Sequence, residues 1–220
     1  MVKPSTIYFE GGLLGMSDGT LESTSALDSA ALDLLFRDAR TVAEFTDQPV
    51  TDEQLRDIYE LTKMGPTAMN IQPLRITWVR SPEARGRLAA HMAEGNKAKT
   101  EAAPLTAVLS FDRSWHRHFA TVFPPAPAQG AVFAANAELS AMMGNNNAHL
   151  QAGYFLLAVR AVGLSAGPMG GFDAAGLDAD LHAGLDRQSF LVVNIGVPGA
   201  TEPRHPRLPR LDYATAVTEL

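Results

Sequence analysis

The sequence predicts a mixed α and β fold in which helices cover both faces of a sheet. Stretches with apolar residues at helical spacing alternate with a few short apolar runs that are typical of buried strands. Consecutive strand-like runs seldom lie close enough along the chain for simple hairpins, so helices should connect them. The 220 residues, 46% of them hydrophobic, are sufficient for one domain with a sizeable core.

The first 25 residues differ in composition from the rest of the chain. They are rich in Gly, Ser and Thr and show no sustained apolar period, which predicts a flexible tail. Two alternatives stay open: translation that begins at Met16, and an arm that reaches a partner subunit. Residues 26–220 are predicted to form a single domain.

Two helices are predicted in the first third of the chain. Apolar residues recur at helical spacing from Ser25 to about Arg37. A second helix begins at Thr51 and Asp52, where a hydroxyl N-cap is followed by an acidic first turn, and it ends at Gly65-Pro66. The residues that mark these periods are Leu27, Ala31, Leu34 and Leu35 in the first helix, and Leu55, Ile58, Tyr59 and Thr62 on the predicted inner face of the second.

Three strands are predicted, at Leu74–Val79, Ala107–Phe111 and Phe190–Gly196. Ser81-Pro82-Glu83 opens a helix after the first strand, with proline in its first turn. A long helical zone follows the proline-rich loop at residues 123–127 and runs to Gly163.

Two further features of the second half are predicted. The long helical zone is interrupted near Gly144-Asn145, where poor helix formers gather. The C-terminal stretch is rich in Pro and Arg and contains one more strand around residues 205–210.

Composition excludes several classes of protein. The net charge of -6 and the lack of a Lys/Arg-rich run argue against nucleic acid or an acidic membrane surface as the main partner. The chain has no cysteine, which excludes disulfides, thiolate metal sites and thiol nucleophiles. No membrane-length apolar run and no signal-peptide pattern is present, so a soluble cytoplasmic protein is expected.

Standard nucleotide and metal signatures are missing. The chain has neither G-x-G-x-x-G nor a Walker A run. Its six histidines include His116 and His118, but no H-E-x-x-H and no His-carboxylate cluster at helical spacing. The histidines are therefore interpreted as surface residues, and no metal site is predicted.

Residues 163–167 match the G-x-S-x-G elbow of serine hydrolases, with Ser165 at the nucleophile position and Asp173, His182 and His205 downstream. The elbow requires a strand before the serine and a helix after it. Here a helical period precedes the serine and Pro168 follows soon after, which favours a helix that ends at Gly163. A serine hydrolase remains the minor alternative.

Three separated stretches have the chemistry of ligand-binding loops. Arg40-Thr41 can supply charge-assisted hydrogen bonds to a phosphate. Residues 65–73 offer a hydroxyl and two side-chain amides between two prolines, which suits a flat ligand with polar edges. Residues 167–173 contain three glycines that allow a ligand to approach the backbone closely. Near the end, residues 205–210 add two arginines on the predicted proline-stiffened strand.

In this order and spacing, these stretches resemble the FMN-dependent nitroreductase family over roughly residues 28–212. The resemblance is carried by Arg40-Thr41 with Phe45, Pro66-Thr67-Ala68-x-Asn70-x-Gln72-Pro73, Gly153 with Leu156-Leu157-Ala158, Gly163-Leu164, Gly167-Pro168-Met169 with Gly171-Phe172-Asp173, Asn194-Ile195-Gly196 and Pro206-Arg207. Gly95-Asn96-x-x-Lys99-Thr100, together with residues 167–173 and 205–211, most resembles the malonic semialdehyde reductase branch of pyrimidine breakdown.

The resemblance implies a nitroreductase-like α+β fold, with a central antiparallel-rich sheet flanked by helices, and a homodimer with FMN at the subunit interface. One subunit would supply Arg40, Thr41, Lys99, Gly167, Pro168, Met169, Gly170, Arg207 and Arg210, and the other would supply Pro66, Thr67, Ala68 and Asn70. Asn70 would meet the pyrimidine edge of the flavin, Lys99 would stabilise negative charge near N1, and the Pro168-Met169 backbone would lie beside N5.

The sequence departs from the family pattern in two places. Ala39 and Ala43 stand where the family often has basic residues, so Arg207 and Arg210 must neutralise more of the phosphate, with Arg37 as a further candidate. Met69 occupies a position that is usually small or polar and could narrow the substrate pocket.

The resemblance also implies the reaction. NADH or NADPH would donate hydride to flavin N5 and depart, and a small carbonyl (such as malonic semialdehyde), nitro or quinone compound would then take the hydride. The cofactor carries this chemistry, so no catalytic side chain is expected. A non-catalytic flavin-binding or sensing module on the same fold is the alternative.

Overall fold

The structure is a computed structural model that describes residues 27–200 and 206–220. Its strands are β1 (Leu74–Val79), β2 (Leu105–Asp112), β3 (Ser165–Met169) and β4 (Arg187–Gly196). Its α-helices are α1 (Ser29–Leu32), α2 (Asp52–Thr62), α3 (Pro82–Ala90), α4 (Glu94–Ala102), α5 (Phe119–Val122), α6 (Gln129–Ala134), α7 (Ala137–Ala161), α8 (Ala174–Leu181) and α9 (Tyr213–Ala216). The other helical segments are η1 (Asp33–Arg37), a π-helix, and the 3-10 helices η2 (Ala68–Asn70) and η3 (Trp115–His118).

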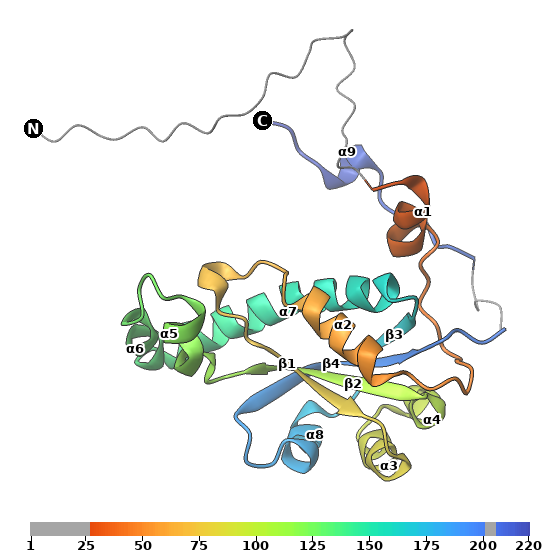
Figure 1. Cartoon of the computed structure of the whole chain (residues 1–220), viewed down its shortest axis with the longest axis horizontal. Coiled ribbons are helices and arrows are strands. Elements are labelled where there is room, and N and C mark those ends of the chain that lie inside the picture. The colour runs from red at the N-terminus through yellow and green to blue at the C-terminus, as the bar shows by residue number, and fades with distance from the viewer. Residues whose placement is uncertain (1–26, 201–205) are drawn as a thin grey trace, which may run out of the picture.

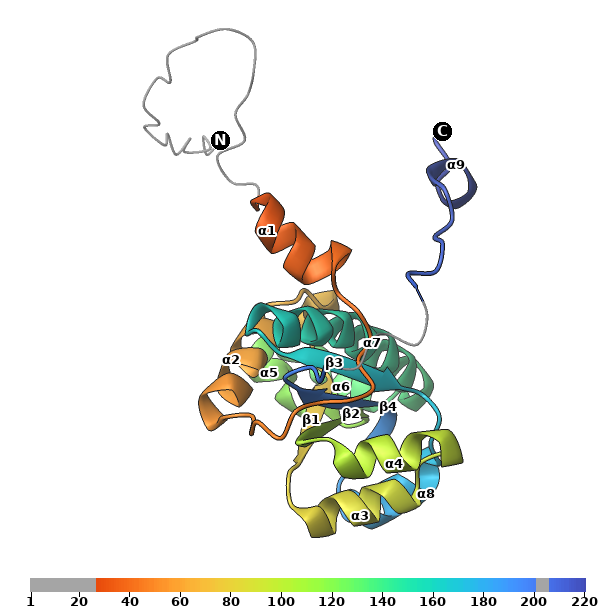
Figure 2. The same cartoon turned by 90° about the vertical axis from the view of Figure 1, so that its right-hand side faces the viewer.

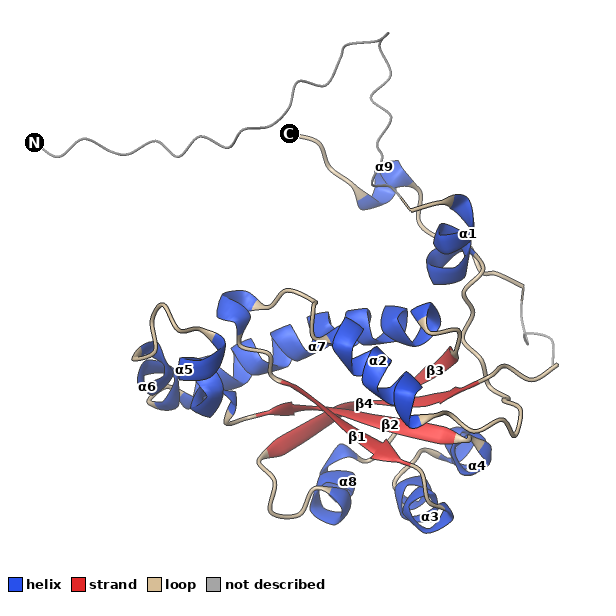
Figure 3. Ribbon diagram, viewed as in Figure 1, coloured by secondary structure: helices blue, strands red, loops and turns tan. Residues whose placement is uncertain are grey.

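The four strands form one sheet in the order β1-β2-β4-β3, and every neighbouring pair is antiparallel. Helices α2 and α7 cover one face of the sheet, and α3, α4 and α8 cover the other (Figures 1, 2 and 3). The predicted fold class, a mixed α and β protein with an antiparallel sheet between helices, is confirmed. Among the described residues, no helix has the length and apolar character needed to cross a membrane.

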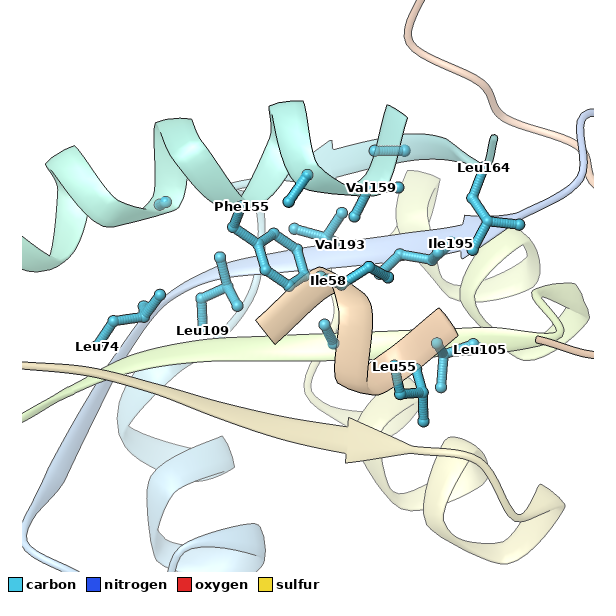
Figure 4. Packing of buried hydrophobic residues seen from close by; sticks show 14 of the residues in the cluster. Leu55, Ile58, Leu74, Leu105, Leu109, Phe155, Val159, Leu164, Val193 and Ile195 are labelled. Carbon is cyan, nitrogen blue, oxygen red and sulfur yellow. The ribbon is translucent and has the colours of Figure 1, made fainter. Parts of the chain in front are cut away.

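The core is divided by the sheet because neighbouring strand residues point to opposite faces. Leu109 of β2 and Val193 of β4 belong to the larger cluster under α2 and α7, whereas their neighbours Val108 and Val192 belong to the cluster on the other face. Phe155 and Val159 of α7 and Ile58 of α2 point into the larger cluster (Figure 4). Burial on both faces explains why β2 and β4 read as continuous apolar runs.

Helix α2 confirms the predicted start and stop signals. The Thr51 hydroxyl accepts from the Gln54 backbone N–H at 3.1 Å, and the Gln54 side chain accepts from the Thr51 N–H at 3.0 Å, which completes a capping box. Leu55, Ile58 and Thr62 are buried as predicted. Tyr59 was expected on the inner face and is instead 51% exposed.

The predicted interruption near Gly144-Asn145 is wrong, because α7 continues unbroken for 25 residues. Gly144 is buried, and a Cβ there would lie 3.0 Å from the indole ring of Trp115. The glycine therefore serves the packing of Trp115 against the helix, and tertiary contacts override its low helix propensity. The predicted end of this helix is confirmed, since Gly163 follows it with φ +80.

Residues 167–173 were predicted as a glycine-rich loop, but Gly167, Pro168 and Met169 belong to strand β3 instead. Gly167 and Pro168 are unusual in a strand, but β3 lies at the edge of the sheet, where proline leaves no ladder bond unmade. Only the following residues, 170–173, are a loop, and Asp173 caps α8 by accepting from the Gly176 N–H at 3.1 Å.

The two terminal segments extend away from the body of the molecule (Figure 1). The predicted first helix is confirmed in part as α1 with η1, although Leu27 and Leu34 are at least half exposed. The predicted C-terminal strand is wrong for residues 206–210, which pair with no strand in the described part of the chain. Pro206 and Pro209 each lack the N–H that a ladder needs.

Some predictions concern residues outside the described ranges. The flexible tail of residues 1–25, the start at Met16 and the contribution of His205 all fall there. The single domain of residues 26–220 stays a prediction.

Candidate functional site

The segment that contains Arg40 and Thr41 crosses the end of the sheet next to β3 and β4. The Val42 N–H donates to the Ala166 carbonyl at 3.3 Å, and the Thr46 N–H donates to the Val197 carbonyl at 2.9 Å. Phe45 and Pro198 form an isolated β-bridge beside these bonds. The backbone of β3 and β4 therefore fixes the position of Arg40 and Thr41.

Gly167 is the residue that permits this crossing. A Cβ at Gly167 would lie 2.4 Å from the carbonyl oxygen of Val42, closer than any side-chain carbon can approach. A glycine inside a strand commonly marks such a close approach of another backbone. Gly167 therefore has a structural reason to be glycine, apart from any ligand.

A cavity of about 750 Å³ lies between this crossing segment, the end of α7 and the residues after β4. Arg40 and Thr41 line it, together with Leu34, Asp38, Ala39, Val42, Ala43, Glu44, Arg160, Gly163, Leu164, Ser165, Pro198, Gly199 and Ala200. Two of the predicted site residues thus border a cavity that is large enough for a part of a cofactor.

Charged side chains of both signs border this cavity, since Asp38 and Glu44 line it along with Arg40 and Arg160. Arg160 donates to the Leu35 carbonyl at 2.9 Å, and Arg207 donates to the Ala39 carbonyl at 3.0 Å. Burial lowers the pKa of Arg160, and the positive charge of Arg207 lowers that pKa further. Two guanidinium groups that repel each other beside a hydroxyl are an arrangement that a bound phosphate would stabilise.

Arg160 was not predicted from the sequence. A basic residue in the last turn of a helix is common because it complements the helix dipole, so nothing local marks it for a site. Arg210 was predicted, but its guanidinium donates to the carbonyls of Leu208 and Pro209 in its own segment. The structure does not place it at the cavity.

Lys99 lies on α4, which is joined to β3 and β4 by two buried side chains. Asn194 of β4 donates to the Lys99 carbonyl at 3.0 Å and accepts from the Thr106 hydroxyl at 2.9 Å. Thr100 donates to the sulfur of Met169 at 3.9 Å. The structure therefore brings Lys99 next to β3, and with it close to Pro168 and Met169.

The residues after β3 are held by the connection between α3 and α4. The Gly171 carbonyl accepts from the Ala93 N–H and from the Asn96 side chain, both at 3.0 Å. Gly170 is exposed, and a Cβ there would meet no atom within 4 Å. The loop thus presents its backbone at Gly170 to open space while Asn96, which was not assigned a role from the sequence, holds its base.

Helix α8 continues this loop and is fixed to α3 by charge. The guanidinium of Arg87 and then the ring of His91 hold the pKa of Asp180 below its ordinary value. His91 also accepts, through its carbonyl, from the Asp173 N–H at 2.8 Å. These contacts keep both ends of residues 170–173 in place.

The other group of predicted residues, Pro66, Thr67, Ala68 and Asn70, lies in the loop after α2. Gly65 lets this loop pass the ring of Tyr154, because a Cβ at Gly65 would lie 2.7 Å from that ring. The Ala68 N–H donates to the side chain of Asn147 on α7 at 2.7 Å. Asn70 is exposed and donates to the Val122 carbonyl at 2.8 Å.

The two groups are not brought together within one chain. The loop is anchored to α7 at Asn147, whereas the cavity is anchored to the same helix at Arg160. Thirteen residues of helix separate these anchors, which corresponds to about 20 Å. Figure 1 shows the loop near α5 and the crossing segment near β3, at opposite ends of α7.

The minor alternatives gain no support from the geometry. Ser165 begins β3 instead of standing between a strand and a helix. His182 was predicted at the surface and is instead buried, with Nε2 2.9 Å from the Thr77 hydroxyl and Nδ1 3.1 Å from Asp178. Across the described residues, no group of three or more His, Asp or Glu could hold a metal ion.

Comparison with known proteins identifies the family to which this chain belongs. The profile of the nitroreductase family matches residues 37–197. A Streptomyces coelicolor protein with the provisional name NADH dehydrogenase/NAD(P)H nitroreductase is 53% identical over 192 residues, which cover 87% of this chain and 97% of that protein. This chain therefore belongs to the nitroreductase family.

Solved structures share the fold. A provisionally named nitroreductase from Bacillus subtilis superposes with a TM-score of 0.77 at 21% identity, over 88% of this chain and 100% of that one. Another from Exiguobacterium sibiricum, solved in complex with FMN, has a TM-score of 0.70 at 19% identity, over 84% of this chain and 94% of that one.

The close approach at Gly167 can be tested by adding a single methyl group. Gly167→Ala should lower the free energy of unfolding by about 1–3 kcal/mol, because the Val42 carbonyl must move away. Gly170→Ala, two residues past Pro168 in open space, is the matched control and should change it by less than about 0.5 kcal/mol. Urea denaturation of both variants measures the difference. Equal stability would show that the crossing segment does not pack on β3.

Proposed function

We propose that this protein is an FMN-dependent oxidoreductase that takes hydride from NADH or NADPH and delivers it to a small carbonyl, nitro or quinone compound. The single observation that carries the proposal is the cavity lined by Arg40, Thr41 and Arg160, with Arg207 bonded to the lining residue Ala39, in a chain of the nitroreductase family. The Streptomyces coelicolor relative carries the name NADH dehydrogenase/NAD(P)H nitroreductase, and the Exiguobacterium sibiricum structure of the same fold contains FMN.

The donors at the cavity fit the phosphate of FMN. Arg40, Arg160 and Arg207 supply positive charge, and Thr41 supplies a hydroxyl. Arg160 and Arg207 replace the charge that Ala39 and Ala43 lack, which answers the departure from the family pattern. Arg37 is instead paired with Asp33 at 2.9 Å. Arg210 remains a proposed contributor only if its segment moves toward the cavity.

The remaining site residues fit the ring system. When bound, FMN supplies a two-electron hydride chemistry that no amino-acid side chain provides. Lys99, which is half-buried and has a freely rotating ammonium group, would hold negative charge at the pyrimidine end of the reduced ring. The backbone of Pro168, Met169 and Gly170 would line the face at which hydride is exchanged.

The proposed assembly is a homodimer in which each flavin site uses both subunits. Pro66, Thr67, Ala68 and Asn70 lie about 20 Å along α7 from the cavity, so a second copy is needed to bring such a loop to it. Met142, Leu150 and Tyr154 of α7 are exposed, as are Phe36 and Leu211 of the terminal segments. This apolar surface is suited to burial between two copies.

The proposed substrate class is a small semialdehyde, such as malonic semialdehyde, as in the branch that the sequence resembles most. Residues 95–100 and 167–173 support this assignment. Met69 is half-buried beside the aromatic cluster of Trp115, Phe119 and Phe133 and would narrow the space for an oxidant. NADH and NADPH are available inside the cell, so the proposal also implies that the protein acts in the cytoplasm.

Flavin binding and reduction test the proposal directly. The purified protein should bind FMN and turn yellow, and NADH or NADPH should bleach it in stopped flow. Arg207→Ala should weaken FMN binding about tenfold, because a charge-assisted phosphate contact is lost. Arg56→Ala, on the exposed side of α2, is the control and should leave the affinity unchanged. A protein that stays colourless with added FMN would contradict the proposal. Binding of FMN that neither NADH nor NADPH can bleach would favour a sensing module.

The substrate class can be read from the reoxidation rate of the reduced protein. Under anaerobic conditions, malonic semialdehyde should restore the flavin absorbance faster than a nitroaromatic compound or a quinone at equal concentration. Mixing two oxidants and measuring which product forms gives the same ranking independently. Reoxidation by the nitro and quinone compounds alone would remove the semialdehyde from the proposal.

Subunit mixing tests the shared site. Arg207→Ala and Asn70→Ala homodimers should each bind FMN weakly, since both copies of the site are damaged. A heterodimer of the two variants contains one site with both defects and one intact site. Co-expressed and doubly tagged heterodimers should therefore bind one FMN per dimer with normal affinity. Absence of any high-affinity site in the heterodimer would show that Arg207 and Asn70 serve the same site from one chain.

A further inference from the structure

The loop that carries Asn70 has an unusual backbone. Met69, Asn70 and Gln72 have φ of 51, 55 and 44, and they are the only non-glycine residues in the described ranges with positive φ. Each such residue costs roughly 1–2 kcal/mol relative to an ordinary conformation, with less for asparagine. A loop with three of them keeps its shape only if its surroundings hold it there.

Several contacts supply that constraint. Ile71, between the strained residues, is 1% exposed and packs with Trp115 and Phe119. The Gln72 N–H donates to the Thr67 hydroxyl at 3.3 Å, and the Gln72 carbonyl accepts from the guanidinium of Arg75 at 2.9 Å. These bonds fix the backbone of Gln72 and do not involve its side chain.

The side chain of Gln72 meets the side chain of Asn70. The Gln72 amide nitrogen donates to the Asn70 carboxamide oxygen at 2.9 Å, and the Asn70 amide nitrogen donates to the Val122 carbonyl at 2.8 Å. Reversal of the Asn70 carboxamide would set two oxygens against each other at Val122, because a backbone carbonyl can only accept. The Val122 carbonyl therefore selects the orientation in which the Asn70 oxygen faces the Gln72 amide N–H.

This orientation determines what Asn70 can offer a ligand. A carboxamide has two N–H donors and two acceptor lone pairs, and the two contacts use one of each. Asn70 is exposed, so one N–H and one lone pair remain for a ligand, at fixed places. The pyrimidine edge of a flavin alternates C=O and N–H groups, and a reversed carboxamide would oppose like groups to it.

We propose that Gln72 is a positioning residue for the cofactor: its amide N–H holds the Asn70 carboxamide in the orientation that the Val122 carbonyl selects, and so helps to determine which hydrogen-bonding groups the loop presents to the flavin. The inference rests on the proposed function and adds a residue that does not itself touch the ring. The contact lies within the strained segment, since Asn70 and Gln72 both have positive φ.

A double-mutant cycle on full-length protein tests this role, with FMN affinity measured by quenching of flavin fluorescence. Gln72→Glu keeps the size of the side chain but can only accept hydrogen bonds, so it selects the reversed Asn70 carboxamide. It should weaken FMN binding at least about tenfold. In an Asn70→Ala background the same change should alter the affinity less than about twofold, because the partner through which it acts is gone. Gln188→Glu on the exposed side of β4 is the matched control and should have no effect.

The absorption spectrum of the bound flavin separates positioning from a general loss of stability. At saturating FMN, Gln72→Glu should shift the visible bands relative to the wild-type protein, and Gln188→Glu should not. Gln72→Ala removes the constraint without reversing the carboxamide, so it should weaken binding less than Gln72→Glu does.

Three outcomes would overturn the role of Gln72. They are wild-type affinity in Gln72→Glu, an equal loss in the Asn70→Ala background, and an unshifted spectrum at saturation. In each case the wild-type protein still binds FMN, so the proposed function survives. Failure of the wild-type protein to bind FMN would instead remove the proposed function, and this inference with it.

Discussion

The rigidity of helix α7 is the constraint on which the rest of the structure depends. It is 25 residues long, and Phe155 and Val159 bury its inner face against the sheet. The loop of Asn70 is bonded to it at Asn147, and the cavity of Arg40 is bordered by it at Arg160. A packed helix cannot shorten, so the distance between these two groups is fixed within one chain. In the proposed homodimer, a two-fold axis would set each of these groups against the other group of the partner subunit.

The places where the chain breaks local rules coincide with the proposed site. Glycine and proline stand inside a strand so that Val42 can lie against Gly167, and three residues near Asn70 take left-handed backbone conformations. Sequences that fold well satisfy most local preferences, and exceptions concentrate where function requires them. Such exceptions occur in both groups of proposed site residues, and the positive-φ residues other than glycine in the described ranges all lie near Asn70.

The charged residues near the cavity also differ from those on the rest of the surface. Several ion pairs are exposed and contribute little to stability, such as Lys97 with Glu94 at 2.9 Å. Near the cavity, Arg160 is partly buried beside Arg207, and its positive charge is disfavoured first by burial and then by the charge of Arg207. A phosphate would relieve this cost on binding. The arrangement thus makes cofactor binding a source of stability for the folded protein.

The sequence by itself determined the fold class, most of the strands and the bounds of α2, and it supplied the residues of the proposed flavin site. These depend on local chemistry: apolar period, capping residues, proline and glycine signals, and motif order. Sequence reasoning missed the unbroken α7 and strand β3, because it interpreted Gly144 and Gly167 only by the low helix and strand propensity of glycine. In the structure, Gly144 makes room for the Trp115 ring and Gly167 for the Val42 carbonyl, and neither contact can be seen from the sequence.

Only the tertiary structure decided which side chains act together. In the sequence, Arg160 looks like an ordinary arginine at a helix C-terminus, and Gln72 looks like an ordinary loop residue. The fold brings Arg207 close to Arg160 and sets Asn70 against Gln72. The fold likewise separated Asn70 from Arg40, although both belong to one motif pattern along the chain. Distances between residues far apart in sequence arise from packing against the sheet, and no local pattern records them.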